Sequence, residues 1–119
     1  MGKIMINTTH GKEDLERATL AFVVGNAALS SGQEAIILLT IDGVWLATRG
    51  YTDNLQADGF APIGEMIANF IKNNGKLWVC GACIKPRNLT AEDLIEGAQV
   101  VGAATAVEVI VNGANTLSF

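Results

Sequence analysis

Short apolar runs and amphipathic segments alternate along the chain, which predicts alternating strands and helices. Residues 3–7 form an apolar, β-branched run, and residues 34–40 contain Ala-Ile-Ile-Leu-Leu, too uniformly apolar for a strand with one solvated face. A run of that kind is typical of a parallel strand covered on both sides. Residues 76–79 form a third apolar run. These segments predict strands of a parallel sheet.

Two segments between these strands have helical periodicity. Residues 13–30 place apolar side chains near helical spacing and end at Ser30-Ser31-Gly32. Residues 63–73 predict a clear amphipathic helix that stops at Asn73-Asn74-Gly75. The segment 44–62 is broken by glycine, proline, aspartate and asparagine, so we predict that it is mostly loop, of the length that often serves as a lid or a contact.

The last third of the chain is rich in valine and alanine and fits neither period cleanly. Residues 98–111 could form one long strand, or a strand, a turn at Gly102 and a helix. We predict the second arrangement, because alanines and a glutamate follow the turn and Asn112-Gly113 suits a helix end. Residues 114–119 then form a last strand. The helix at 103–112 is apolar around most of its circumference, so it needs cover on more than one side, and a subunit interface would supply it.

Five strands separated by helices imply right-handed crossovers and a parallel sheet in three layers. The 119 residues should form a single domain over 1–119, and a composition that is 50% hydrophobic and 17% charged argues against intrinsic disorder. The 8 basic and 12 acidic residues give a net charge of -4, which argues against nucleic acid as the main partner. No signal peptide is visible, and the longest apolar stretch is interrupted by Glu108 and too short for a membrane span. We therefore expect a cytoplasmic protein.

The two cysteines of the chain lie in one segment, Val79-Cys80-Gly81-Ala82-Cys83, with Lys85 and Arg87 just downstream. The preceding apolar run ends a strand, and Thr90-Ala91-Glu92-Asp93 indicates a helix start with a reciprocal cap. We therefore expect the cysteines in a loop at the carboxyl end of the third strand, where open α/β sheets bind ligands. The two cations and the helix N-terminus would favour a thiolate there.

From the residues alone, several chemistries stay open for this pair. In the cytoplasm a paired cysteine motif is more often redox, sulfur-handling or metal-binding than a structural staple, and two unreactive buried thiols are the plain alternative. Structural zinc normally takes four ligands, and the chain offers Cys80, Cys83, His10 and carboxylates, so zinc between subunits stays open. His10 follows the first strand and should share the sheet edge of the cysteines, as a base, a ligand or an ordinary turn histidine. Asp42-Gly43 is first of all a turn signal.

The order of motifs along nearly the whole chain resembles the DsrE/DsrF-like, or YchN-like, family. The resemblance rests on the opening Ile4-Met5-Ile6-Asn7-Thr8-Thr9-His10-Gly11, the cysteine segment with Arg87, Leu94-Ile95-Glu96-Gly97-Ala98, and the closing Thr116-Leu117-Ser118-Phe119. It implies a three-layer α/β/α domain whose five-stranded parallel sheet has the order 4-3-2-1-5. It also implies a homo-oligomer, as a trimer or a hexamer.

Several members of this family are sulfur carriers, and their working cysteine lies directly after the third strand, which matches Cys80. Cys83 matches the second cysteine of the YchN-type variant, which leaves open a relay carrier or a dithiol relative. Asn88 departs from the pattern, because many relatives have glycine after the arginine.

The resemblance and thiol chemistry together predict that the Cys80 thiolate takes sulfane sulfur from a persulfide donor and passes it to an acceptor thiol of a partner protein. His10, Lys85 and Arg87 would support it, and Cys83 could release sulfide and leave an internal disulfide. We expect a sulfurtransferase-like carrier rather than a classical turnover enzyme, with no cofactor or resident metal. The alternatives are a dithiol redox protein and a non-catalytic oligomeric binding module, with metal binding as one form of it.

Overall fold

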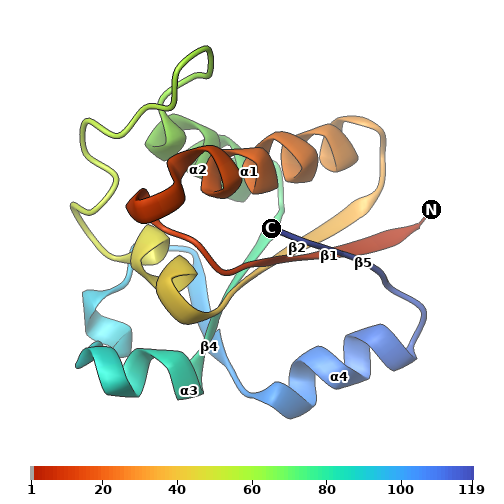
Figure 1. Ribbon diagram of the computed structural model, residues 1–119. Helices are drawn as coiled ribbons and strands as arrows, with labels where there is room; N and C mark the ends of the chain where they lie inside the picture. Colours follow the sequence, from red (N-terminus) through yellow and green to blue (C-terminus); the bar gives the residue numbers. More distant parts are fainter. Residues whose placement is uncertain (1) are drawn as a thin grey trace.

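The computed structural model describes residues 2–119 and contains one sheet of five parallel strands. The strands are β1 (Lys3–Thr8), β2 (Glu34–Leu39), β3 (Lys76–Cys80), β4 (Ala98–Val101) and β5 (Asn115–Ser118). Their order across the sheet is β4-β3-β2-β1-β5, with every neighbouring pair parallel (Figure 1). The predicted α/β class, strand number and strand order are therefore confirmed.

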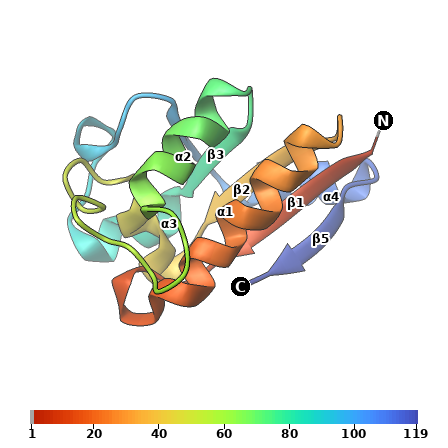
Figure 2. The same cartoon turned by 90° about the horizontal axis from the view of Figure 1, so that it is seen from above.

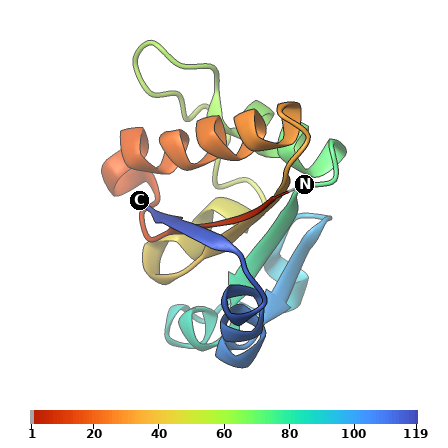
Figure 3. The same cartoon turned by 90° about the vertical axis from the view of Figure 1, so that its right-hand side faces the viewer.

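Helices cover the sheet on both sides, so the molecule has three layers (Figure 3). The α-helices are α1 (Leu15–Ser30), α2 (Ile63–Lys72), α3 (Gly81–Ile84) and α4 (Ala103–Val111). Helices α1 and α2 lie side by side on one face, as the view from above shows (Figure 2), and α3 and α4 lie on the other. Four 3-10 turns complete the set, namely η1 (Lys12–Asp14), η2 (Ile41–Ala47), η3 (Lys85–Arg87) and η4 (Ala91–Asp93).

Strand β2 is buried on both faces. Successive side chains of a strand point to opposite sides of the sheet, and both sides are covered here. Ile37 and Leu39 belong to the main core beneath α1 and α2, whereas Ile36 and Leu38 belong to a smaller cluster with Trp78 on the α4 side. The uniformly apolar sequence of this strand is thus explained by cover from both layers.

Helices α1 and α2 approach each other closely over the main core. Phe22 and Phe70 meet edge to face with ring centroids 5.9 Å apart, a favoured aromatic arrangement. Gly25 allows this contact, because a Cβ at that position would lie 2.8 Å from a methyl of Ile37 and 3.0 Å from the Phe70 ring. Asn26 adds a hydrogen bond from its side-chain amide to the Met66 carbonyl at 3.1 Å.

Helix α4 covers its side of the sheet less completely. Ala106 and Val109 pack against the smaller cluster. In contrast, Val107, Ile110 and Val111 are 56%, 45% and 76% exposed. The predicted turn at Gly102 and the following helix are confirmed, and residues 2–119 leave the apolar outer surface of that helix uncovered.

Two local predictions were wrong in detail. The cysteines do not lie in a loop, because Cys80 is the last residue of β3 and Cys83 lies within the single turn of α3. Pro86 follows in the first positions of η3, where a residue without an N–H group is tolerated. The predicted loop at 44–62 begins inside a seven-residue 3-10 helix, η2. That helix forms because Val44, Leu46 and Ala47 are buried in the main core.

The predicted helix start and reciprocal cap at Thr90 are confirmed, and the helix is the single turn of η4. The Thr90 N–H donates to Asp93 Oδ2 at 2.8 Å. Leu94 then returns to an extended backbone and forms an antiparallel bridge with Thr48. The pairing with another segment ends the helix after this turn.

We predict that Gly43→Ala will destabilise the protein by at least about 2 kcal/mol, as overpacking of a rigid site does. A Cβ at Gly43 would collide with the carbonyl oxygen of Thr8, which accepts a hydrogen bond from the Thr40 N–H at 3.0 Å and cannot move freely. Gly102→Ala is the matched control, because a Cβ there meets nothing within 4 Å. Urea unfolding of the two variants measures the difference, and equal stabilities would contradict the packing argument.

Candidate functional site

Cys80 ends strand β3 at the carboxyl edge of the sheet. It follows Trp78 by two residues and is paired in register with Val101, so its side chain lies on the α4 side. The thiol is half-buried and borders a cavity of about 220 Å³ between the strand ends and α4. The structure thus gives Cys80 a free space beside its sulfur.

Cys83 lies one helical turn further on and has a different environment. Its half-buried side chain packs against the main core beneath η2 and does not line the cavity. Burial raises the pKa of the Cys83 thiol, and hydrogen bonding and charge repulsion from the Cys80 sulfur raise it further. The Ile41 N–H and the Arg87 guanidinium oppose this rise in pKa. For Cys83 the expected preference for a thiolate is therefore reversed, because desolvation of the charged form has the larger effect.

Ile41 holds the N–H group that faces Cys83, and its backbone is in an unusual conformation. Its φ angle is 55°, in the left-handed region. The other non-glycine residues with positive φ are Asn54, Asn74 and Asn88, a residue type that tolerates this region, whereas a β-branched side chain is an outlier there. Such strain costs on the order of 1–3 kcal/mol and is common at functional sites.

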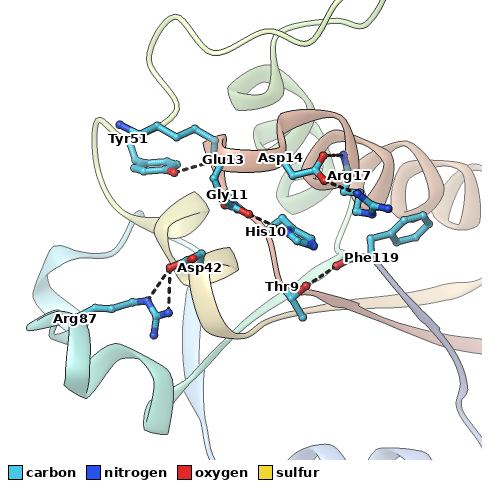
Figure 4. A network of polar contacts seen from close by, with 11 residues as sticks. Thr9, His10, Gly11, Glu13, Asp14, Arg17, Asp42, Tyr51, Arg87 and Phe119 are labelled. Atoms are coloured by element: carbon cyan, nitrogen blue, oxygen red, sulfur yellow. Dashed lines mark hydrogen bonds and ion pairs between the residues drawn. The ribbon is translucent and has the colours of Figure 1, made fainter.

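Arg87 joins the cysteine segment to η2. Its Nε and Nη2 atoms donate to Asp42 Oδ1 at 3.2 and 3.0 Å (Figure 4). Its Nη1 atom donates to the Cys83 carbonyl oxygen at 3.0 Å. Asn88 follows in the left-handed conformation, with φ 58° and ψ 33°. Asparagine and glycine both suit that conformation, so Asn88 can occupy a position at which the family resemblance implies glycine.

His10 and Lys85 lie near the same edge but make other contacts. The His10 Nδ1 atom bonds Glu13 Oε2 at 2.6 Å, at the start of α1 (Figure 4). Lys85 is exposed at the start of η3. The structure therefore brings Cys80, Cys83 and Arg87 together directly, and it bonds His10 to a carboxylate instead.

A second cavity lies at the start of the long loop. It is lined by Asp42, by two residues of η1, and by the aromatic rings of Trp45 and Tyr51. Trp45 and Tyr51 stack with centroids 6.0 Å apart, and the Tyr51 hydroxyl accepts the Lys12 N–H at 2.8 Å. Burial raises the pKa of Tyr51. The cavity beside them measures about 450 Å³. These rings anchor the start of the loop on the fold.

Within residues 2–119, no three side chains of His, Cys, Asp or Glu are grouped so as to hold a metal ion. No helix in that part of the chain has both the length and the apolar character needed to cross a membrane.

Sequence reasoning missed the backbone of Ile41 and the cavity at Cys80. An isoleucine gives no local signal for a left-handed conformation, so only the tertiary structure reveals it. The cavity combines residues from three strands and α4. The small residues after Gly102 were the available signal, because alanines at a helix start leave space beside a neighbouring strand.

We predict that Cys83 will be alkylated at higher pH in the folded chain than in the chain unfolded in urea. The Cys80→Ser variant isolates this thiol and retains burial, the main cause of its raised pKa. Replacing Arg87 with methionine in that background should move the midpoint higher still, because a nearby positive charge is lost. Lys85→Met is the matched control and should leave the midpoint unchanged. Iodoacetamide rates measured against pH test this, and a folded midpoint at or below the unfolded one would contradict it.

The chain matches the model of the DsrE/DsrF-like family over residues 2–119. It is 30% identical to an uncharacterized protein of Methanocaldococcus jannaschii over 101 residues, which cover 85% of this chain and 36% of that protein. A second uncharacterized protein of the same organism is 30% identical over 116 residues, covering 98% of this chain and 96% of the relative. The chain therefore spans about a third of the first relative and nearly all of the second.

Two solved structures share the fold over their full length. A protein of unknown function from Methanobacterium thermoautotrophicum superposes with a TM-score of 0.81 at 13% identity. The ychN protein of E. coli superposes with a TM-score of 0.76 at 19% identity. In both pairs 100% of each chain is covered. At such low identity the likeness concerns the fold alone. Because the family model covers all of the described residues, the chain belongs to the DsrE/DsrF-like family, which is associated in general with sulfur relay.

Proposed function

We propose that this protein carries sulfane sulfur as a persulfide on Cys80. The observation that carries the proposal is the position of the Cys80 thiol, which ends β3 at the carboxyl edge of the sheet and borders a cavity. Ligands bind at that edge in open α/β sheets. Membership of a family associated with sulfur relay supports the same chemistry.

The transfer requires two displacements at sulfur. The Cys80 thiolate attacks the outer sulfur of a donor R–S–SH, a Cys80–S–SH persulfide forms, and R–S⁻ leaves. The thiolate of an acceptor protein then attacks the same outer sulfur, takes it as its own persulfide, and regenerates the Cys80 thiolate. Both steps conserve charge and need no external oxidant. The donor and acceptor are proteins of a relay, which we place in the cytoplasm, where thiols stay reduced.

Cys80 is a better carrier than Cys83 because the two thiols have different surroundings. The thiolate is the nucleophile in exchange, and burial raises the pKa of the Cys83 thiol. Cys80 borders open space, whereas Cys83 packs against the main core. His10, Lys85 and Arg87 stay in supporting roles in this proposal, with Arg87 holding the cysteine segment in place.

The closeness of the two cysteines favours dithiol chemistry as the second candidate function. Cys80 ends β3 and Cys83 lies in the single helical turn that follows, and the Cys80 thiol raises the pKa of Cys83. A Cys83 thiolate could therefore attack the inner sulfur of a Cys80 persulfide, form the Cys80–Cys83 disulfide and release HS⁻. A relay carrier needs only Cys80, whereas this reaction needs both cysteines.

We predict that incubation with a sulfane-sulfur donor will add about 32 Da to the Cys80 peptide, the mass of one sulfur atom in a reversible persulfide. Cys80→Ser should lose the adduct. Cys83→Ser should keep it, and should hold it longer if Cys83 releases sulfide. Peptide mass spectrometry after alkylation measures these species. The absence of any adduct with several donors would rule out the carrier and favour a non-catalytic binding module.

The exposed surface of α4 supports assembly into a homo-oligomer. Three neighbouring apolar side chains of this helix are solvent-exposed, namely Val107, Ile110 and Val111. Contiguous apolar surface of that kind marks interaction sites. We propose that further copies of the chain cover it, in the trimers or hexamers that the family resemblance implies.

A charge at the centre of this surface should weaken the assembly. Val111 is 76% exposed, so Val111→Glu should leave the fold intact and reduce the molar mass measured by light scattering. Ala27→Glu is the matched control, because Ala27 is exposed on α1, away from this surface. A wild-type protein with the mass of one chain, or a variant with unchanged mass, would contradict the proposal.

A further inference from the structure

The cavity beside Cys80 lies where three strands end against the first turns of α4. Its volume is about 220 Å³. Thr40 and Cys80 lie on its strand side, and the rest of the lining consists of small or apolar residues, namely Leu38, Val101, Gly102, Ala103, Ala106 and Val107. Within residues 2–119, no charged side chain lines it.

The one hydroxyl in the lining already has a partner. Thr40 Oγ1 donates its proton to Asn7 Oδ1 at 2.9 Å. The cavity therefore offers little to a polar ligand and suits an occupant that is apolar and polarizable. Divalent sulfur has this character, and Cys80 can attach such an occupant covalently.

The size of the cavity exceeds the need of a single transferred sulfur. A water molecule occupies about 30 Å³ in the liquid, and a sulfur atom is of comparable size, so the cavity has room for several sulfur atoms. We infer that Cys80 holds a polysulfide chain, with two or more sulfane sulfurs in this cavity. The inference rests on the proposed carrier function and adds to it the length and the site of the cargo.

The chain would grow by the same displacement that loads the first sulfur. The Cys80 thiolate attacks a terminal sulfur of S₄²⁻, giving Cys80–S–S⁻ and S₃²⁻. The terminal sulfur of Cys80–S–S⁻ then attacks another S₄²⁻, giving Cys80–S–S–S⁻ and a second S₃²⁻. Each step moves one neutral sulfur atom and conserves charge, so no oxidant or reductant is needed.

The geometry also suits the charge at the end of such a chain. Gly102 and Ala103 lie at the N-terminus of α4, where the first turn has no side-chain cap. The N–H groups of a helix N-terminus favour negative charge. The neutral inner sulfurs would therefore occupy the apolar part of the cavity, with the anionic terminal sulfur toward the helix end.

The test uses inorganic tetrasulfide as the donor and the Cys83→Ser background, so that Cys83 cannot shorten the chain. Excess donor is removed, the terminal sulfur is alkylated, and the intact protein is weighed. Relative to the alkylated protein without added sulfur, we expect mass increases of about 64 and 96 Da beside one of about 32 Da. Each increase corresponds to whole sulfur atoms on Cys80.

Filling the cavity should limit the length of the chain. Ala106→Leu places bulk in the half-buried part of the lining, and Ala103→Leu does so from an exposed position that should not disturb folding. Both variants should keep the single-sulfur adduct and lose the longer ones. Ala104→Leu is the matched control, because Ala104 is exposed on the same helix turn and does not line the cavity.

The outcomes separate the two proposals. A wild-type cavity that yields only the single-sulfur adduct overturns the polysulfide inference and leaves the carrier function standing. The polysulfide inference is also overturned if the filled variants carry the longer adducts at the same abundance as the protein with the wild-type cavity. No adduct of any length overturns both proposals.

Discussion

The sharp turn after β2 determines the geometry around the cysteine pair. Ile41 adopts a left-handed backbone, and Gly43 lets η2 pass directly over the end of β1. The strain at Ile41, on the order of 1–3 kcal/mol, is offset by burial beneath η2. Val44 and Leu46 are 0% and 1% exposed, and burial of each stabilises the fold by about 1.5–3 kcal/mol. The fold therefore tolerates the strained turn, which directs the Ile41 N–H toward Cys83.

The same turn gives Arg87 its partner. Asp42 directly follows Ile41, and its carboxylate accepts two hydrogen bonds from the guanidinium. Asp42 is 44% exposed at its side chain, so the ion pair itself adds little stability, as is usual for exposed pairs. Its importance is geometric, because Arg87 also binds the Cys83 carbonyl and so joins α3 to η2. A planar group with several donors suits this role better than lysine.

Local sequence patterns predict the layers and the position of the cysteines, but not the contacts around them. The short, uniformly apolar run at 34–40 is typical of a strand covered on both faces, and the segment at 63–73 has the period of an amphipathic helix. Ile41 lacks such a signal, because its left-handed backbone is imposed by packing and contradicts its own preference. The bond between Arg87 and Asp42 joins residues 45 positions apart, which no local pattern contains. The predicted loop at the cysteines became a helical turn for a related reason, since residues 83 and 84 pack against the main core.

The different surroundings of the two thiols link the cargo to assembly. Cys83 packs against the main core. Cys80 faces the layer that α4 covers only in part, and Val107 both lines its cavity and belongs to the exposed apolar surface of that helix. A second copy of the chain seated on α4 would therefore also cover the mouth of the cavity. Water would then be excluded from sulfur stored on Cys80, and the acceptor thiol would have to enter from the edge where the strands end.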